Sequence, residues 1–269
     1  MPVLVVAAHR PVARLLALRL LAEGGEVRAV ASDGVEGLRG AGIHVAVAAA
    51  DDTGRIEAAA TRVHTVVHLA GGLGGLAADR VLGEGLAVVR AAEGAGARRL
   101  VLVTAGGTAP GSSDPVRIAH AAIEAAALTA DVPSVVVRAP VVDTPRVRSL
   151  LRGLDAEERV RCHGLPMVAA DDLIELLVAL DRARSNAREG HVVLDASAPV
   201  RLAPEGAGEG RLGGVVLSGQ ERARLLTTLA GPWEGPEAGL PDAWELMGVV
   251  PGRAAAGVTD GAAGSERSP

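Results

Sequence analysis

Short apolar runs alternate with longer segments of helical periodicity along the first 140 residues. The apolar runs are rich in Val and Leu and show no polar/apolar alternation, which is typical of strands buried on both faces. They predict strands at 3–7, 26–31, 43–47, 65–70, 100–104 and 134–138. Apolar positions at helical spacing predict helices at 12–22, 76–95 and 115–130. This alternation predicts an α/β fold, a doubly wound (Rossmann) parallel sheet.

The pattern loosens after Pro140. It still predicts helices at 145–154, 171–184, 220–229 and 242–247, a strand at 191–194 and a Gly-rich loop at 203–214. We therefore expect a single Rossmann-type domain over residues 1–252. In it, about 140–252 form a small C-terminal substrate-binding region, a lid at the carboxyl ends of the strands. The tail at 253–269 lacks periodicity and is expected to be disordered.

Composition narrows the functional classes. The 269 residues are 49% hydrophobic and 22% charged, a balance typical of globular proteins. A net charge of −5 argues against a nucleic-acid-binding surface. The chain lacks both a long apolar run and a basic start before an apolar core, so we expect a cytoplasmic protein with no membrane partner. Because Cys162 is the one cysteine, an internal disulfide is excluded.

Two missing residue types constrain the chemistry further. The sequence contains no tyrosine, and all 27 of its basic residues other than histidine are arginine. Any mechanism that needs a tyrosine or a lysine of this chain is therefore excluded. The seven histidines show no metal-binding spacing, so we expect no metal.

The first strand-to-helix turn is where a doubly wound fold binds a dinucleotide pyrophosphate. The turn reads VAAHRPVA over residues 6–13 and resembles the T-G-A-T-G-x-x-G loop of atypical and extended short-chain dehydrogenase/reductases. Ala7, Arg10 and Ala13 replace the three family glycines. Alanine still permits close backbone approach, and the Arg10 guanidinium could reach a phosphate. The alternative is a decayed loop with Arg10 as a solvated surface charge.

The resemblance extends over about residues 1–200. It is carried by GGEVRAVASD at 24–33, HLAG at 68–71, RRLVLVTA at 98–105, VVVRAP at 135–140 and VAADDL at 168–173. It implies binding of NADPH, because the family's acidic ribose-binding position falls at Ala31 and is followed by Ser32, although Asp33 is close. The cofactor-binding residues expected from it are Ala7, His9, Arg10, Pro11, Val12, Ser32, Leu69, Ala70, Gly71, Thr104 and His120.

The family's acid–base set is missing at every aligned position. The tyrosine, lysine and serine positions fall at Val116, His120 and Gly106. The asparagine position of the fourth helix falls at Val81. No catalytic residue is therefore certain, and the candidates are Thr104, Ser112 and His120.

Two functions fit this combination. Hydride transfer needs only a nicotinamide held against a carbonyl. The proton can come from water, from another side chain or from the substrate, and an aromatic ketone with a neighbouring phenol is suited to the last route. The chain thus resembles the tyrosine-less ketoreductases of angucyclinone tailoring, such as that of simocyclinone biosynthesis. These are NADPH-dependent enzymes that reduce a carbonyl of an aromatic polyketide antibiotic precursor. The alternative is a catalytically inactive, NmrA-like dinucleotide-binding regulator. The partner is then a small aromatic ketone or a sensed ligand, and the oligomeric state stays open.

The remaining polar candidates are more readily explained by structure. His68 ends a core strand and is expected to be buried, and His163 is expected to be an ordinary loop residue. Asp171 and Asp172 are expected to cap the helix that follows them. Ser112 lies in a Gly/Pro-rich loop, where a turn role and a bond to a substrate oxygen fit equally well.

Overall fold

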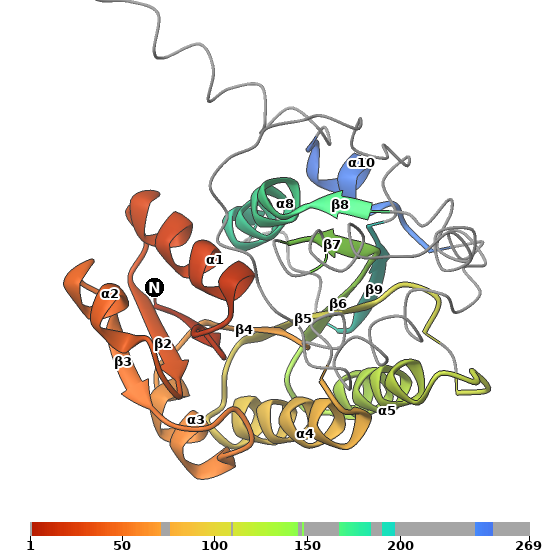
Figure 1. Cartoon of the computed structure of the whole chain (residues 1–269), viewed down its shortest axis with the longest axis horizontal. Helices are drawn as coiled ribbons and strands as arrows, with labels where there is room; N and C mark the ends of the chain where they lie inside the picture. The colour runs from red at the N-terminus through yellow and green to blue at the C-terminus, as the bar shows by residue number, and fades with distance from the viewer. Residues whose placement is uncertain are drawn as a thin grey trace, which may run out of the picture.

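The computed structural model describes residues 2–70, 76–108, 110–144, 147, 167–183, 190–196 and 240–249. Within these ranges, seven parallel strands form one sheet in the order β3-β2-β1-β4-β5-β6-β9 (Figure 1). The strands are β1 (Val3–Val6), β2 (Val27–Ala31), β3 (His44–Val47), β4 (Thr65–Leu69), β5 (Arg99–Ala105), β6 (Ser134–Ala139) and β9 (Val192–Asp195). The predicted doubly wound α/β fold is confirmed.

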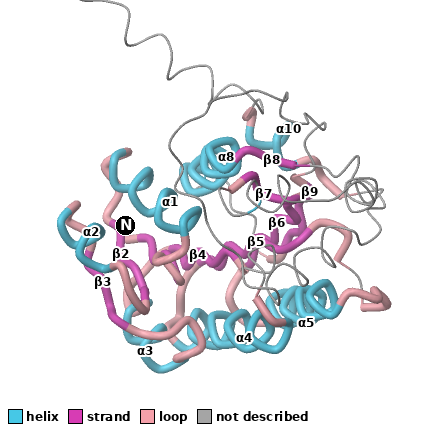
Figure 2. Tube along the Cα trace, viewed as in Figure 1, coloured by secondary structure: helices cyan, strands magenta, loops and turns pink. Residues whose placement is uncertain are grey.

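Helices cover both faces of this sheet. One face carries α1 (Pro11–Ala22), α2 (Val35–Gly40), α8 (Ala170–Arg182) and α10 (Ala243–Met247). The other carries α3 (Thr53–Ala60), α4 (Ala78–Gly94) and α5 (Pro115–Thr129). Figures 1 and 2 show α1 and α8 above the strands and α3, α4 and α5 below them.

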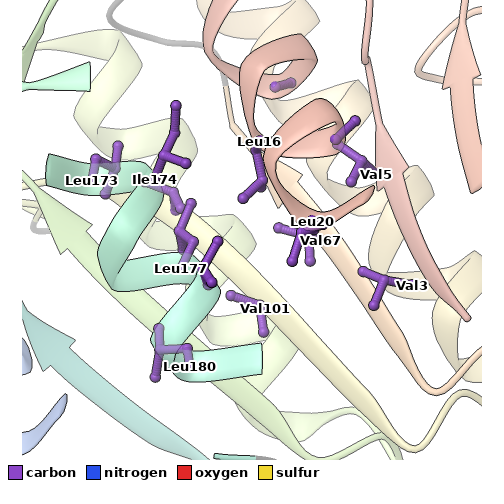
Figure 3. Packing of buried hydrophobic residues seen from close by; sticks show 14 of the residues in the cluster. Val3, Val5, Leu16, Leu20, Val67, Val101, Leu173, Ile174, Leu177 and Leu180 are labelled. Atoms are coloured by element: carbon purple, nitrogen blue, oxygen red, sulfur yellow. The ribbon is translucent and has the colours of Figure 1, made fainter. Parts of the chain in front are cut away.

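The first helical layer brings distant parts of the sequence together. Leu16 and Leu20 of α1 pack beside Leu177 of α8, over the strand residues Val5 and Val67 (Figure 3). Each fully buried Leu or Val contributes roughly 1.5–3 kcal/mol relative to an exposed one. This contact fixes α1, and with it the first strand-to-helix turn, against the sheet.

The second layer depends on a close approach of α4 and α5. A Cβ atom on Gly85 would lie 2.4 Å from Cδ1 of Ile123, so the two helices can touch here only because Gly85 has no side chain. Glycine inside a helix costs about 1 kcal/mol relative to alanine, and the interhelical packing offsets this cost. The helices α4 and α5 are thereby held side by side.

Several elements differ from the prediction. The short helices α2 and α3 were not predicted, nor was a second, two-stranded sheet of β7 (Val141–Asp143) and β8 (Met167–Ala169). The expectation that Asp171 and Asp172 cap a helix is wrong. That helix, α8, begins at Ala170 after the N-cap residue Ala169, and both carboxylates lie inside its first turn. There they stabilise the helix through its dipole.

Part of the C-terminal prediction can be placed. The strand expected at 191–194 is β9, which pairs with β6 in the main sheet. The helix expected at 171–184 is α8, and the one at 242–247 is α10. The segments 203–214, 220–229 and 253–269 lie outside the described residues, as does nearly all of 145–154. No helix in the described part of the chain is long and apolar enough to span a membrane.

Candidate functional site

The sheet has one topological switch point, between β1 and β4. From β1 the chain winds outward through β2 to β3, and it then returns to place β4 on the other side of β1. At the carboxyl ends of β1 and β4 the connections therefore run in opposite directions, the arrangement that forms a crevice in doubly wound sheets. In doubly wound sheets this crevice is the ligand-binding position.

Ala7 begins the turn that enters this crevice from β1. Its φ of 59° is left-handed, although the residue is not glycine. The turn is closed by the Arg10 N–H, which donates to the Ala7 carbonyl oxygen at 2.9 Å. A side chain in this conformation costs roughly 1–2 kcal/mol. The chain therefore keeps the backbone shape of a glycine turn with alanine at its first position.

The N-terminus of α1 follows this turn and is open to an anion. No side chain caps the helix, whose N-cap residue is Arg10 and whose first residue is Pro11. The N–H groups of the first helical turn and the positive end of the dipole thus face the crevice. Ala13 is buried against the sheet, where it has the close-packing role of a third glycine.

Arg10 is partly buried and forms an ion pair. Its Nη2 donates to Oε2 of Glu84, a residue of α4 that is 2% exposed. The same carboxylate accepts a bond from Nε of Arg80 at 2.9 Å. Because α1 and α4 lie on opposite faces of the sheet, the Arg10 side chain crosses the switch-point crevice. The alternative of a solvated surface charge is wrong, because the Arg10 guanidinium is paired with the buried Glu84 carboxylate in this structure.

Ser32 and Asp33 follow the end of β2, and His9, from the turn after β1, lies beside them. The Ser32 hydroxyl donates to Oδ2 of Asp33 at 3.0 Å, and the Ser32 N–H donates to Nδ1 of His9 at 3.4 Å. Burial, and next the charge of Arg10, lower the pKa of His9, so its ring is neutral near neutral pH. The Asp33 carboxylate therefore lies beside Ser32, the residue that follows the aligned ribose-binding position Ala31.

Arg14 is a cation at this end of the crevice that sequence reasoning missed. A Cβ atom on Gly37 would lie 2.2 Å from its Nη2, so the guanidinium lies directly over the first turns of α2. The sequence places Arg14 four residues after Arg10, one helical turn further along the chain. With Arg10 held at Glu84, Arg14 is the arginine positioned beside the Ser32–Gly34 turn.

Thr104, a predicted site residue, lies in a buried polar cluster at the end of β5. Its hydroxyl donates to Oε1 of Glu124 at 2.6 Å, and Arg138 of β6 donates to both oxygens of the same carboxylate. Glu124 is 3% exposed and lies on α5. The one proton of the Thr104 hydroxyl is thus engaged with Glu124, and the cluster ties two strands to a helix.

His120 is held at the carboxyl end of β5 in one orientation. Its Nδ1 accepts a hydrogen bond of 2.6 Å from the Ala105 N–H. Burial, and next the charge of Arg117, lower the pKa of His120 to about 4. Near neutral pH the ring is therefore neutral, with its proton on Nε2, and that buried nitrogen has no protein partner. His120 is a hydrogen-bond donor rather than a charged acid.

His68 is fully buried on β4, as expected. Neither of its ring nitrogens has a hydrogen-bond partner, although one of them must carry a proton. Burial is the main cause that lowers its pKa to about 3, and the charges of Arg10 and His120 add to it. The neutral ring therefore adds polarity, and no charge, to the layer beneath α4.

The other predicted positions are less informative. The Ala70 N–H donates to the Val103 carbonyl oxygen at 3.0 Å, beside Leu69 at the end of β4, whereas Gly71 lies outside the described residues. Ser112 Oγ accepts from the Asp114 N–H at 3.1 Å and so has the turn role. His163 lies outside the described residues. Val116 is buried at the tyrosine position, and no cluster of metal-ligating side chains occurs in the described ranges.

Comparisons with known proteins bear on the fold. No family model and no curated protein sequence matches the chain. Among solved structures, triphenylmethane reductase of Citrobacter sp. complexed with NADP(H) is similar with a TM-score of 0.56 and 16% identity, over 71% of this chain and 67% of that one. Alfalfa vestitone reductase is similar with a TM-score of 0.56 and 14% identity, over 74% and 77%. A short-chain dehydrogenase/reductase superfamily protein of Agrobacterium tumefaciens with bound NAD gives a TM-score of 0.53 and 16% identity, over 74% and 79%. The chain thus has the Rossmann-like fold of these proteins.

Proposed function

We propose that this protein is an NADPH-dependent ketoreductase that reduces a carbonyl of an aromatic polyketide without a protein tyrosine or lysine. The observation that carries the dinucleotide-binding part is the left-handed Ala7 at the turn from β1 to α1. A residue with a side chain keeps this costly conformation because the surrounding turn requires it. The uncapped α1 then offers its N–H groups to a pyrophosphate.

Three features of the described residues support binding of a nicotinamide dinucleotide here. The small residues Ala7 and Ala13 permit close backbone approach at the turn. Arg14 lies beside the Ser32–Gly34 turn and would attract a 2′-phosphate, which supports NADPH, although the Asp33 carboxylate opposes it. His120 Nε2 is a neutral donor suited to a ribose hydroxyl.

The chemistry follows from what the chain provides. A bound nicotinamide supplies the hydride, which adds to the carbonyl carbon of the ketone and leaves an alkoxide oxygen. The phenol next to this carbonyl donates its proton to the alkoxide, so the products are an alcohol and a phenolate. The protein contributes positioning, which is worth on the order of 7–11 kcal/mol in favourable intramolecular cases, and a pocket that excludes water.

A second function is supported by the ion pair of Arg10 and Glu84. A side chain across the crevice fits a regulator that binds a dinucleotide without turning it over. The regulator should bind NADPH and oxidise it with no ketone, whereas the ketoreductase should bind NADPH and oxidise it with its ketone substrate.

Calorimetric titration with NADPH and NADH tests the cofactor site. Pro11 is exposed at the first position of α1, so Pro11→Glu places a carboxylate beside the proposed pyrophosphate and leaves the core unchanged. We expect this variant to weaken NADPH binding by tenfold or more, roughly one unfavourable charge contact. Leu15→Glu, one turn further on and 45% exposed, is the matched control and should bind as the wild type does. Equal affinities in all three proteins, or no binding by the wild type, would remove the site from the first turn.

A further inference from the structure

Glu84 forms an ion pair with Arg10 at the position where the dinucleotide is proposed to bind. Arg10 stands at the second position of the glycine loop, where glycine normally lets the backbone approach the pyrophosphate. Its side chain leaves this position, crosses the crevice from the α1 side to the α4 side and ends on the Glu84 carboxylate. A pyrophosphate at the N-terminus of α1 and the Glu84 carboxylate therefore require the same guanidinium.

From this arrangement we propose that Glu84 is an internal competitor of the cofactor phosphates. In the free protein it holds Arg10 across the crevice, and on binding Arg10 exchanges the carboxylate for the pyrophosphate. The inference rests on the proposed dinucleotide site and adds a residue that sets the affinity of that site.

The exchange does not leave the buried Glu84 carboxylate without a partner. Glu84 is shared by two arginines, and Arg80 binds its other oxygen, Oε1, at 2.9 Å from one helical turn away. When Arg10 leaves, the carboxylate keeps Arg80 as its partner. The loss of both partners would cost several kcal/mol, and Arg80 prevents this loss.

The contact of Arg10 with Glu84 uses only one terminal nitrogen of the guanidinium. Its Nη1 is buried and has no hydrogen-bond partner, whereas Nη2 is the nitrogen that binds Glu84. In its buried pair with Glu124, by contrast, Arg138 donates to the carboxylate through two nitrogens, Nε and Nη2. The half-used guanidinium therefore favours a replaceable contact at Arg10 over a permanent tie.

A double-mutant cycle on dinucleotide affinity tests the competition. Glu84→Gln keeps the side-chain volume and removes the charge, so NADPH should bind about tenfold more tightly than to the wild type. In an Arg10→Ala background the same Glu84→Gln change should give no gain, because no guanidinium is left to release. Asp79→Asn removes an exposed carboxylate from the first turn of α4 and is the control for a general change in charge.

The outcomes separate the competition from the cofactor site itself. Circular dichroism and thermal unfolding establish that each variant is folded. If Glu84→Gln does not fold, Glu84→Asp replaces it; this variant keeps the charge and should show no gain in NADPH affinity. A gain confined to proteins that contain Arg10 supports the proposal. Unchanged or weaker binding in Glu84→Gln, or an equal gain in the Arg10→Ala background, overturns the competition and leaves the proposed function standing. No binding of NADPH or NADH by the wild type or by Glu84→Gln overturns both.

Discussion

His120 and Ala105 are joined by a 2.6 Å hydrogen bond in which the backbone N–H of the strand residue donates to Nδ1 of the ring. Because Nδ1 accepts, the proton of the neutral imidazole lies on Nε2, which points away from this bond. The contact therefore decides what His120 can do: it can donate one hydrogen bond, and it does not carry a positive charge near neutral pH.

His120→Asn should separate these two roles. The asparagine oxygen can accept the same bond from the Ala105 N–H, but the Nε2 donor is gone. We expect kcat to be largely kept and KM for NADPH to rise, because His120 holds the cofactor and does not supply the proton. Steady-state kinetics on a phenolic ketone measure both constants. His120→Leu, which leaves the Ala105 N–H unpaired in the core, should in addition lower the free energy of unfolding by about 1–3 kcal/mol. A collapse of kcat in His120→Asn with unchanged KM would make His120 the acid.

The buried histidines should make the protein sensitive to acid. Burial lowers the pKa values of His68 and His120 from 6.5 to about 3 and about 4 in the folded protein. As the pH falls below about 6.5, the unfolded chain binds protons at these rings and the folded chain does not. The free energy of unfolding therefore falls by up to about 1.4 kcal/mol per pH unit for each ring, until the folded pKa is reached. Urea unfolding between about pH 7 and about pH 5 measures this slope.

His68→Leu should reduce that slope by up to half. It should also stabilise the protein near pH 7 by about 1–3 kcal/mol, since it removes a buried polar group whose nitrogens have no partner. The matched control is His44→Gln on the edge strand β3, where the side chain is exposed and the slope should not change. A slope that His68→Leu leaves intact would assign the acid sensitivity to other groups.

Ala7 and Ala13 should respond to glycine with opposite signs. Ala7→Gly relieves a left-handed alanine and should raise the free energy of unfolding by up to about 1 kcal/mol, after the larger entropy of glycine in the unfolded chain is deducted. Ala13→Gly restores another family position, but inside α1, and should lower this free energy by about 1 kcal/mol. Chemical denaturation of both variants measures the difference. Equal effects would contradict the strained turn.

Thr104→Val is expected to lower the stability of the fold and to leave turnover unchanged. It removes the donor to a buried Glu124 oxygen, so the free energy of unfolding should fall by about 1–3 kcal/mol while turnover is kept. Thr129→Val, on the exposed end of α5, is the control for a hydroxyl that bonds only its own helix. Lost turnover at unchanged stability would place Thr104 among the groups that touch the substrate.

Most of the fold, and less of the candidate site, could be predicted from the sequence. Strands such as β4 and β5 were predictable because Val-rich runs without alternation are typical of a parallel sheet. The helices α2 and α3 were missed because both are short, and the glycines of α2 and the alanines of α3 leave neither with a clear apolar stripe. Arg10 was singled out from the loop pattern, but its partner lies 74 residues away on the opposite face of the sheet. Such a contact follows only from the strand order, which local periodicity does not contain.

The central claim is hydride transfer to a ketone whose own phenol supplies the proton, and isotope transfer from NADPH tests it most directly. The protein is incubated with NADPH deuterated at the transferable C4 position and with an aromatic ketone that carries a neighbouring phenol. Mass spectrometry of the product should show deuterium at the new carbinol carbon. The methyl ether of the same ketone should still bind and should give no deuterated alcohol. Equal deuterium transfer to the methyl ether, or none to the phenol, would contradict the account.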